Sequence, residues 1–183
     1  MPSNPAAALA AGSLAEAARD VANEDAPAYE LIELLFFAYR DFVGDPDRIL
    51  DEYGFGRAHH RVLHFVDRHP GLTIAELLDI LRITKQSLNR VLKELVETGF
   101  VEQRAGTADR RQRLLSCTPA GRGLAARLAQ IQTRRVRRAL AGQGPEVREA
   151  AGRFLLAMVD PADRGEVGRL VAGGLAGIAP PRG

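Results

Sequence analysis

The stretch that decides the fold is residues 72–121, which read LTIAELLDILRITKQSLNRVLKELVETGFVEQRAGTADRRQRLLSCTPAG. Within it, Thr73 and Glu76 have the spacing of a capping box, which predicts the start of a short helix. Thr84 can cap a second helix, and Gly99 provides its stop. Because only a tight turn is left between them, the two helices are predicted to form a helix-turn-helix.

The pattern changes from helix to strand after Gly99. Residues 100–104 and 112–117 are predicted as the two strands of a β-hairpin. A hairpin directly after a helix-turn-helix is a wing. The predicted fold class is therefore mainly α with a small β-hairpin wing, a winged helix-turn-helix.

The second of the two short helices has two unlike sides. At about 100° per residue, its apolar residues share one side and are expected to face the core; these are Leu88, Val91, Leu92 and Leu95. The other side carries hydrogen-bonding groups, from Gln86, Ser87, Asn89, Arg90 and Lys93. Arginine reads guanine edges, and Gln and Asn can read adenine, so this helix suits a DNA major groove. The alternative is an ordinary solvated surface.

Charge is unevenly distributed along the chain. Residues 1–56 hold three basic and eleven acidic residues, a net charge of −8. Residues 57–141 hold seventeen basic and seven acidic residues, a net charge of +10, and residues 142–183 are balanced. A basic middle is typical of a nucleic-acid-binding unit, although charged faces can also be simply solvated. The basic hairpin suits a minor groove.

The flanking segments are mostly helical in pattern. A helix over 29–43 is apolar on nearly every side, which predicts packing on its own core and on a second chain; residues 44–47, Gly-Asp-Pro-Asp, are expected to end it. Residues 1–26 are predicted to be a mobile Ala-rich, acidic tail, and residues 27–55 an N-terminal dimerisation helix with its linker. The winged helix-turn-helix is predicted at 56–117, C-terminal dimerisation helices at 118–160, and a helical tail at 161–183.

Several of these motifs together resemble the MarR family of bacterial regulators. The first helix of that family is matched by 73–77 and its recognition helix by 84–95. Its strand entry is matched by 99–102, its wing by Asp109-Arg110-Arg111, and its exit by 115–121. About fifty residues match closely, and the flanking helices match in order and length over most of 27–160. The Ala-rich head and the Gly-rich tail after Pro161 depart from the family pattern.

The resemblance implies a homodimer whose N- and C-terminal helices intertwine. It also implies two winged lobes on a near-palindrome, a recognition helix in the major groove, and Arg110 or Arg111 in the minor groove. Members are commonly released from DNA by a small ligand, a metal or cysteine oxidation. The residues predicted to contact double-stranded DNA are Thr73, Thr84, Lys85, Gln86, Ser87, Asn89, Arg90, Lys93, Arg104, Arg110 and Arg111.

Three histidines lie in the helix before the helix-turn-helix. His60 and His64 have the i, i+4 spacing that can place two imidazoles on one metal, but the HExxH motif is absent. Packing or a ligand pocket is favoured over a metal site. The family's pocket, between the dimer helices and the winged lobe, is predicted to involve His59, His60 and His64 with Phe36 and Tyr39.

Other sequence features limit the function. The single cysteine, Cys117, excludes an intramolecular disulfide and is expected to be a buried inert thiol rather than a redox sensor. No basic leader and no membrane-length apolar run occur, so a cytoplasmic protein is expected. No catalytic arrangement stands out, and neither an enzyme nor a cofactor is predicted. The prediction is a DNA-binding repressor released by an effector; the alternative is a winged-helix protein-interaction module.

Overall fold

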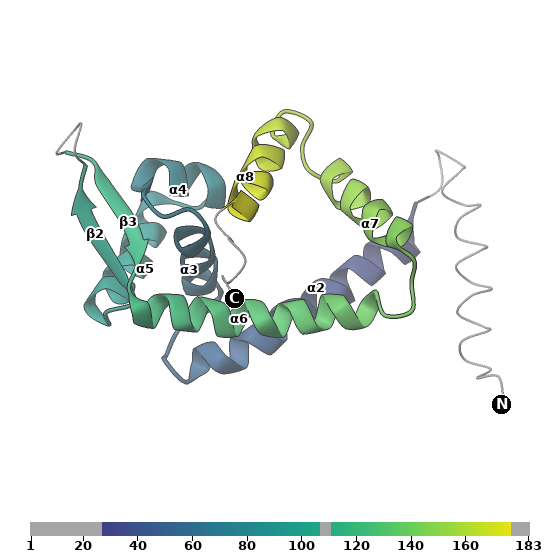
Figure 1. The fold of residues 1–183 in the computed structure, drawn as a ribbon, viewed down its shortest axis with the longest axis horizontal. Coiled ribbons are helices and arrows are strands. Elements are labelled where there is room, and N and C mark those ends of the chain that lie inside the picture. The colour runs from purple at the N-terminus through teal and green to yellow at the C-terminus, as the bar shows by residue number, and fades with distance from the viewer. Residues whose placement is uncertain (1–26, 107–110, 177–183) are drawn as a thin grey trace, which may run out of the picture. The chain divides into compact units, whose positions relative to one another are not determined.

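The computed structural model describes residues 27–106 and 111–176 (Figure 1). The chain divides into two units, residues 1–44 and residues 45–183. The predicted N-terminal tail and the last seven residues lie outside the described part of the chain. The predicted fold class is confirmed, because the described residues form mainly helices with one small antiparallel sheet. None of the described helices is both long and apolar enough to cross a membrane.

The first described helix, α2 (Tyr29–Asp51), is longer than predicted. The expectation that residues 44–47 end it was wrong, because the helix continues through Pro46. A proline inside a helix costs about 3 kcal/mol. Ile49 and Leu50 are buried one turn later, and burying each contributes about 1.5–3 kcal/mol. Packing of the last turns therefore offsets the helix-breaking tendency of the proline.

The helix-turn-helix forms as predicted. Its two helices are α4 (Ile74–Leu81) and α5 (Lys85–Glu97), and α3 (Arg57–Arg68) precedes them. The capping box is present, since the Thr73 hydroxyl accepts from the Glu76 amide at 3.2 Å while the Glu76 carboxylate accepts from the Thr73 amide at 2.7 Å. The turn after α4 is made by Arg82, which has a left-handed backbone conformation.

The wing is a three-stranded sheet of β1 (Leu72–Thr73), β2 (Val101–Ala105) and β3 (Arg113–Cys117) in the order β1-β3-β2. The two hairpin strands are confirmed to within one residue at each end. The two-residue β1 was not predicted, because a strand this short has no periodicity. It pairs Leu72 with Leu115.

Three further helices follow, namely α6 (Pro119–Ala139), α7 (Pro145–Ala157) and α8 (Arg164–Ala176). Thr118 caps α6 by accepting from the Gly121 amide at 3.1 Å. A side chain at Gly121 would meet the backbone carbonyl of Phe100, so glycine is needed where α6 crosses the entry of β2. The hydrophobic core of the second unit lies between α3, α5, α6 and the sheet.

Candidate nucleic-acid interface

Helix α5 presents a polar side to solvent over an apolar side in the core. Leu88 and Leu95 are fully buried, and Val91 and Leu92 are nearly so, as the spacing predicts. The side chains of α5 that are expected to meet DNA are all exposed; they are Lys85, Gln86, Ser87, Asn89, Arg90 and Lys93. Because the apolar side packs against α3 and β2, the polar side is held on a rigid support.

Two of the predicted DNA contacts also serve as helix caps. The Thr84 hydroxyl accepts from the Ser87 amide at 3.2 Å and donates to the Ser87 hydroxyl at 2.9 Å. Thr73 closes the capping box of α4. Both caps lie at helix N-termini, where partial positive charge and free amides favour a phosphate. The structure therefore gives Thr73 and Thr84 a structural role beside any contact with DNA.

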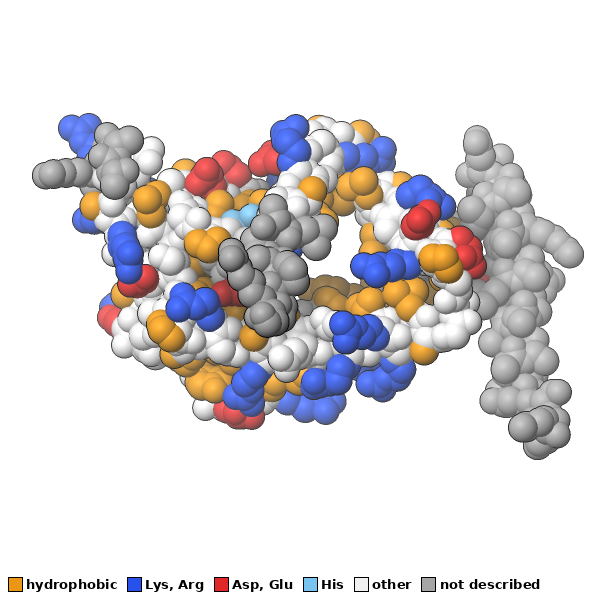
Figure 2. All heavy atoms as spheres, viewed as in Figure 1, with side chains coloured by type: hydrophobic (Ala, Val, Ile, Leu, Met, Phe, Trp, Pro, Cys, Tyr) orange, Lys and Arg blue, Asp and Glu red, His pale blue; other side chains and the backbone are white. Residues whose placement is uncertain are grey.

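The wing carries basic side chains toward its outer end (Figure 2). Arg104 on β2 is exposed and lies 2.9 Å from the Glu102 carboxylate. Arg111 and Arg113 are also exposed. Arg110, with the rest of residues 107–110, lies outside the described residues. The choice between Arg110 and Arg111 as the minor-groove arginine therefore stays a prediction.

Glu94, which contacts the predicted DNA-binding residue Arg90, was not singled out by sequence reasoning. Its Oε1 lies 3.4 Å from Nη1 of Arg90, and its Oε2 lies 2.7 Å from Nε2 of His59. The i, i+4 spacing of Arg90 and Glu94 is a signal for the first contact. The second contact joins residues 35 positions apart, so no local pattern could have indicated it.

The predicted ligand-pocket residues fall in different surroundings. Phe36 and Tyr39 are exposed on α2, with 67% and 57% of their surface accessible. His59 is buried and packs its ring on Phe55. Desolvation lowers the pKa of His60, and desolvation and nearby positive groups lower the pKa of His64. A common pocket for these five residues stays a prediction.

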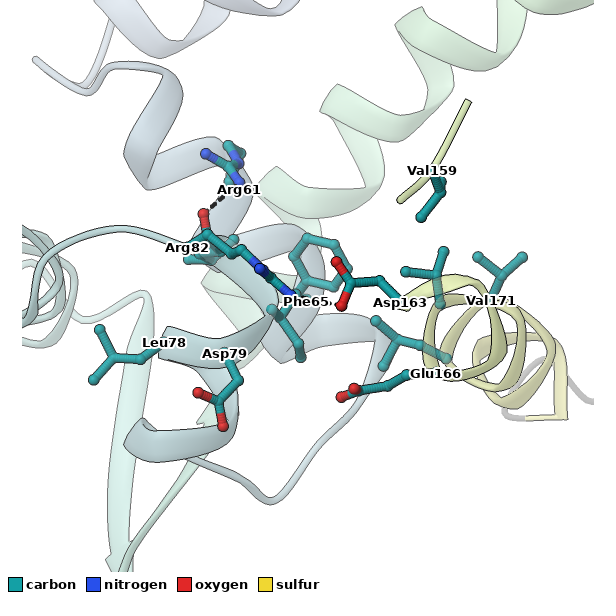
Figure 3. A pocket seen from close by; sticks show the side chains of 13 residues that line it. Arg61, Phe65, Leu78, Asp79, Arg82, Val159, Asp163, Glu166 and Val171 are labelled. Atoms are coloured by element: carbon teal, nitrogen blue, oxygen red, sulfur yellow. Dashed lines mark hydrogen bonds and ion pairs between the residues drawn. The ribbon is translucent and has the colours of Figure 1, made fainter. Parts of the chain in front are cut away.

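A separate cavity of about 810 Å³ lies between α3, α4 and α8 (Figure 3). Its walls are mostly apolar, with Phe65, Leu78 and Val167 among them. Across it, Nη2 of Arg82 lies 2.7 Å from Oδ1 of Asp163. None of the five predicted pocket residues lines this cavity. Arg82 is also the left-handed residue that ends α4, with φ of 49°.

Cys117 is buried at the end of β3, as expected. Its Sγ lies 3.8 Å from the carbonyl oxygen of Leu63. Burial raises the pKa of the thiol to about 12, so the reactive thiolate is scarce at neutral pH. Among the described residues, no three His, Cys, Asp or Glu side chains gather closely enough to hold a metal ion.

Comparison with known proteins agrees with this geometry. Residues 53–112 match the model of the MarR family. The HTH-type transcriptional regulator PetP of Rhodobacter capsulatus is 50% identical over 133 residues, which are 73% of this chain and 80% of PetP.

Two solved structures share the fold. Streptococcus pneumoniae FabT in complex with DNA superposes with a TM-score of 0.62 at 17% identity, covering 72% of this chain and 94% of FabT. Bordetella bronchiseptica BpsR has its DNA binding regulated by 6-hydroxynicotinic acid. It superposes with a TM-score of 0.56 at 21% identity, covering 72% of this chain and 99% of BpsR. The identity with PetP, the family match and the shared fold together establish that this chain belongs to the MarR family of transcriptional regulators.

Proposed function

We propose that the chain is a homodimeric repressor that binds a specific DNA sequence and is released by a small-molecule effector. The observation that carries the proposal is helix α5, whose exposed hydrogen-bonding side stands over a fully buried apolar side. Such a helix enters the major groove while the neighbouring basic hairpin reaches the adjacent groove. The DNA complex of FabT, which has the same fold, supports this interpretation.

Exposed apolar side chains support the dimer. The first unit exposes large aromatic and aliphatic groups along α2, namely Tyr29, Leu31, Ile32, Leu34, Leu35, Phe36, Phe37, Tyr39 and Phe42. Helix α7 of the second unit exposes Phe154, Leu155 and Leu156. Monomeric proteins rarely leave contiguous apolar surface of this kind in water. A second copy of the chain is the partner that would cover these surfaces in the proposed dimer.

Release by an effector has two supports. The cavity beside Arg82 is large enough for a small molecule, since ligand sites are commonly about 300–1,000 Å³. It borders the residue that ends α4 and leads into α5. BpsR, of the same fold, has its DNA binding regulated by a small aromatic acid. In this proposal, a bound ligand shifts the turn and with it the recognition helix.

The first experiment measures binding of the purified protein to DNA from its own upstream region. Non-specific competitor DNA is present, and the salt concentration is varied. A specific regulator retains binding in the presence of competitor and binds as a dimer. Loss of binding to competitor, followed by a random-sequence selection that finds no motif, would instead favour the protein-interaction module.

A pair of arginine variants then separates base reading by α5 from the contact of the wing with DNA. Arg90→Ala should weaken binding to the specific site by about 1–3 kcal/mol and relax base choice, because Arg90 is expected to read a base edge. Arg111→Ala should weaken binding more evenly across sequences. Equal loss from Arg90→Ala on every DNA would exclude Arg90 as a base reader.

A further inference from the structure

A buried histidine and an exposed arginine share one carboxylate on the recognition helix. Glu94 is the fourth residue after Arg90 on α5, and its two oxygens point to different partners. Oε2 lies 2.7 Å from Nε2 of His59 on α3, and Oε1 lies 3.4 Å from Nη1 of Arg90. The carboxylate therefore connects a buried histidine of α3 with a side chain expected to read DNA.

His59 is held firmly enough to fix the carboxylate. Its side chain is 7% exposed, and its ring stacks on Phe55 with centroids 4.6 Å apart and planes 9° apart. The Gly56 amide donates to Nδ1 at 3.1 Å. Since Nδ1 accepts this bond, the ring proton lies on Nε2, which donates to Glu94. One oxygen of Glu94 is thus anchored to the core, and the other faces Arg90.

The contact with Arg90 is looser than the contact with His59. Arg90 is 70% exposed, and a surface pair at 3.4 Å contributes little to stability. Such a contact restricts where the guanidinium points without holding it back from DNA. The negative charge also penalises a non-specific approach to phosphate, and a repulsive element of this kind raises specificity more than affinity.

We propose that Glu94 is a positioning residue, anchored by His59, which directs Arg90 toward its base pair and so sets the base preference of the recognition helix. The inference rests on the proposed function, because it requires that Arg90 reads a base. It adds to that function a residue which need not touch DNA at all. Preorganisation of the arginine by a supporting carboxylate is the physical basis.

Glu97 provides a matched control on the same helix. It is also an i, i+4 partner of a basic residue, Lys93, at 3.8 Å, and its side chain is 62% exposed. No buried side chain anchors it among the contacts of the described residues. Glu94→Gln and Glu97→Gln each remove one negative charge from α5, so a charge effect alone would be the same in both. In Glu94→Gln, the new amide oxygen can still accept from His59, but the side chain no longer attracts the guanidinium.

The experiment compares full-length variants on the selected DNA site and on sites with single base-pair changes, at one salt concentration. Glu94→Gln is expected to lower discrimination at the base pair read by Arg90 by about fivefold, a coupling typical of residues in contact. Glu97→Gln should leave that discrimination unchanged. Both should raise non-specific affinity by a similar factor. His59→Phe keeps an aromatic ring but removes the hydrogen bond, and should act in the same direction as Glu94→Gln.

A double variant tests whether Glu94 acts through Arg90. In the Arg90→Ala background, Glu94→Gln should change discrimination no further, and thermal unfolding should show that both variants are folded. Equal discrimination by Glu94→Gln and Glu97→Gln would overturn the proposal, as would a further loss in the Arg90→Ala background. Lack of specific binding by the unaltered protein would instead overturn the proposed function itself, and with it the role of Glu94.

Discussion

Helix α5 and the first part of α2, residues 29–43, are both rich in apolar residues, but they use them differently. In α5 the apolar groups form one side, and Leu88 and Leu95 are fully buried within the chain. In α2 they occur all round, and Phe36 remains 67% exposed. A helix with one apolar side can be satisfied by a single chain, whereas a helix apolar all round needs a second surface. Exposure in the isolated chain therefore marks where a partner is expected.

The largest expected effects come from truncating one residue of each helix. Leu92→Ala on α5 should lower the free energy of unfolding by about 2–5 kcal/mol, because Leu92 is 2% exposed and its removal leaves a cavity. Phe36→Ala on α2 should leave the unfolding of a single chain almost unchanged. It should instead weaken dimer association by at least tenfold, which corresponds to about 1.4 kcal/mol.

Urea unfolding measures the free energy of unfolding, and sedimentation over a range of protein concentrations measures dimer association. An unchanged dimer in the Phe36→Ala variant would show that the exposed apolar surface of α2 serves another purpose. An unfolding free energy unchanged by Leu92→Ala would contradict the packing of the second unit, residues 45–183, which is the winged unit.

Two glycines on α6 test how closely this helix packs against the start of β2. Gly121→Ala places a Cβ against the backbone carbonyl of Phe100. Because the atom in the way belongs to the backbone, it cannot move aside as the end of a flexible side chain could. We expect a loss of about 3 kcal/mol in unfolding free energy. Gly123→Ala, two residues on, meets nothing within 4 Å and should gain about 0.5–1 kcal/mol. Thermal unfolding of both variants is the measurement, and equal effects would contradict the close crossing.

A smaller effect on the free energy of unfolding is expected from pH near neutrality. We expect it only in the winged unit, because all four histidines lie within residues 59–69. Desolvation lowers the pKa of His60 and of His64 below 6.5 in the folded state. The unfolded chain therefore binds protons first as pH falls, and stability decreases as pH drops from about 6.5 through the lowered folded values. Above about pH 7.5 both residues are neutral in both states, and no effect is expected.

Chemical unfolding between about pH 5.5 and 7.5 measures this dependence. The His60→Gln and His64→Gln variants should each flatten the curve, and a curve unchanged by both would assign the pH dependence to other groups. His69 also has a pKa lowered by desolvation, so part of the slope should remain in either variant.

Local sequence signals were sufficient to predict helix ends where the capping residues lie within the same short segment as the helix. The caps at Thr73 and Thr84 were predicted from side chains that satisfy free amides within three residues. The prediction failed at Pro46, where burial of residues later in α2 outweighs the local cost. The contact of His59 with Glu94 was also beyond a local pattern, since it depends on how α3 packs on α5.

The sequence alone determined the two helices of the helix-turn-helix, the hairpin after them, the polar side of α5 and the family resemblance, because helix periodicity and capping act over only a few neighbouring residues. Tertiary structure alone decided that α2 continues past Pro46, that Gly121 lies against Phe100, and that Glu94 joins Arg90 to the core. These depend on surfaces brought together from distant parts of the chain, where burial and close contact are worth several kcal/mol and override local preference.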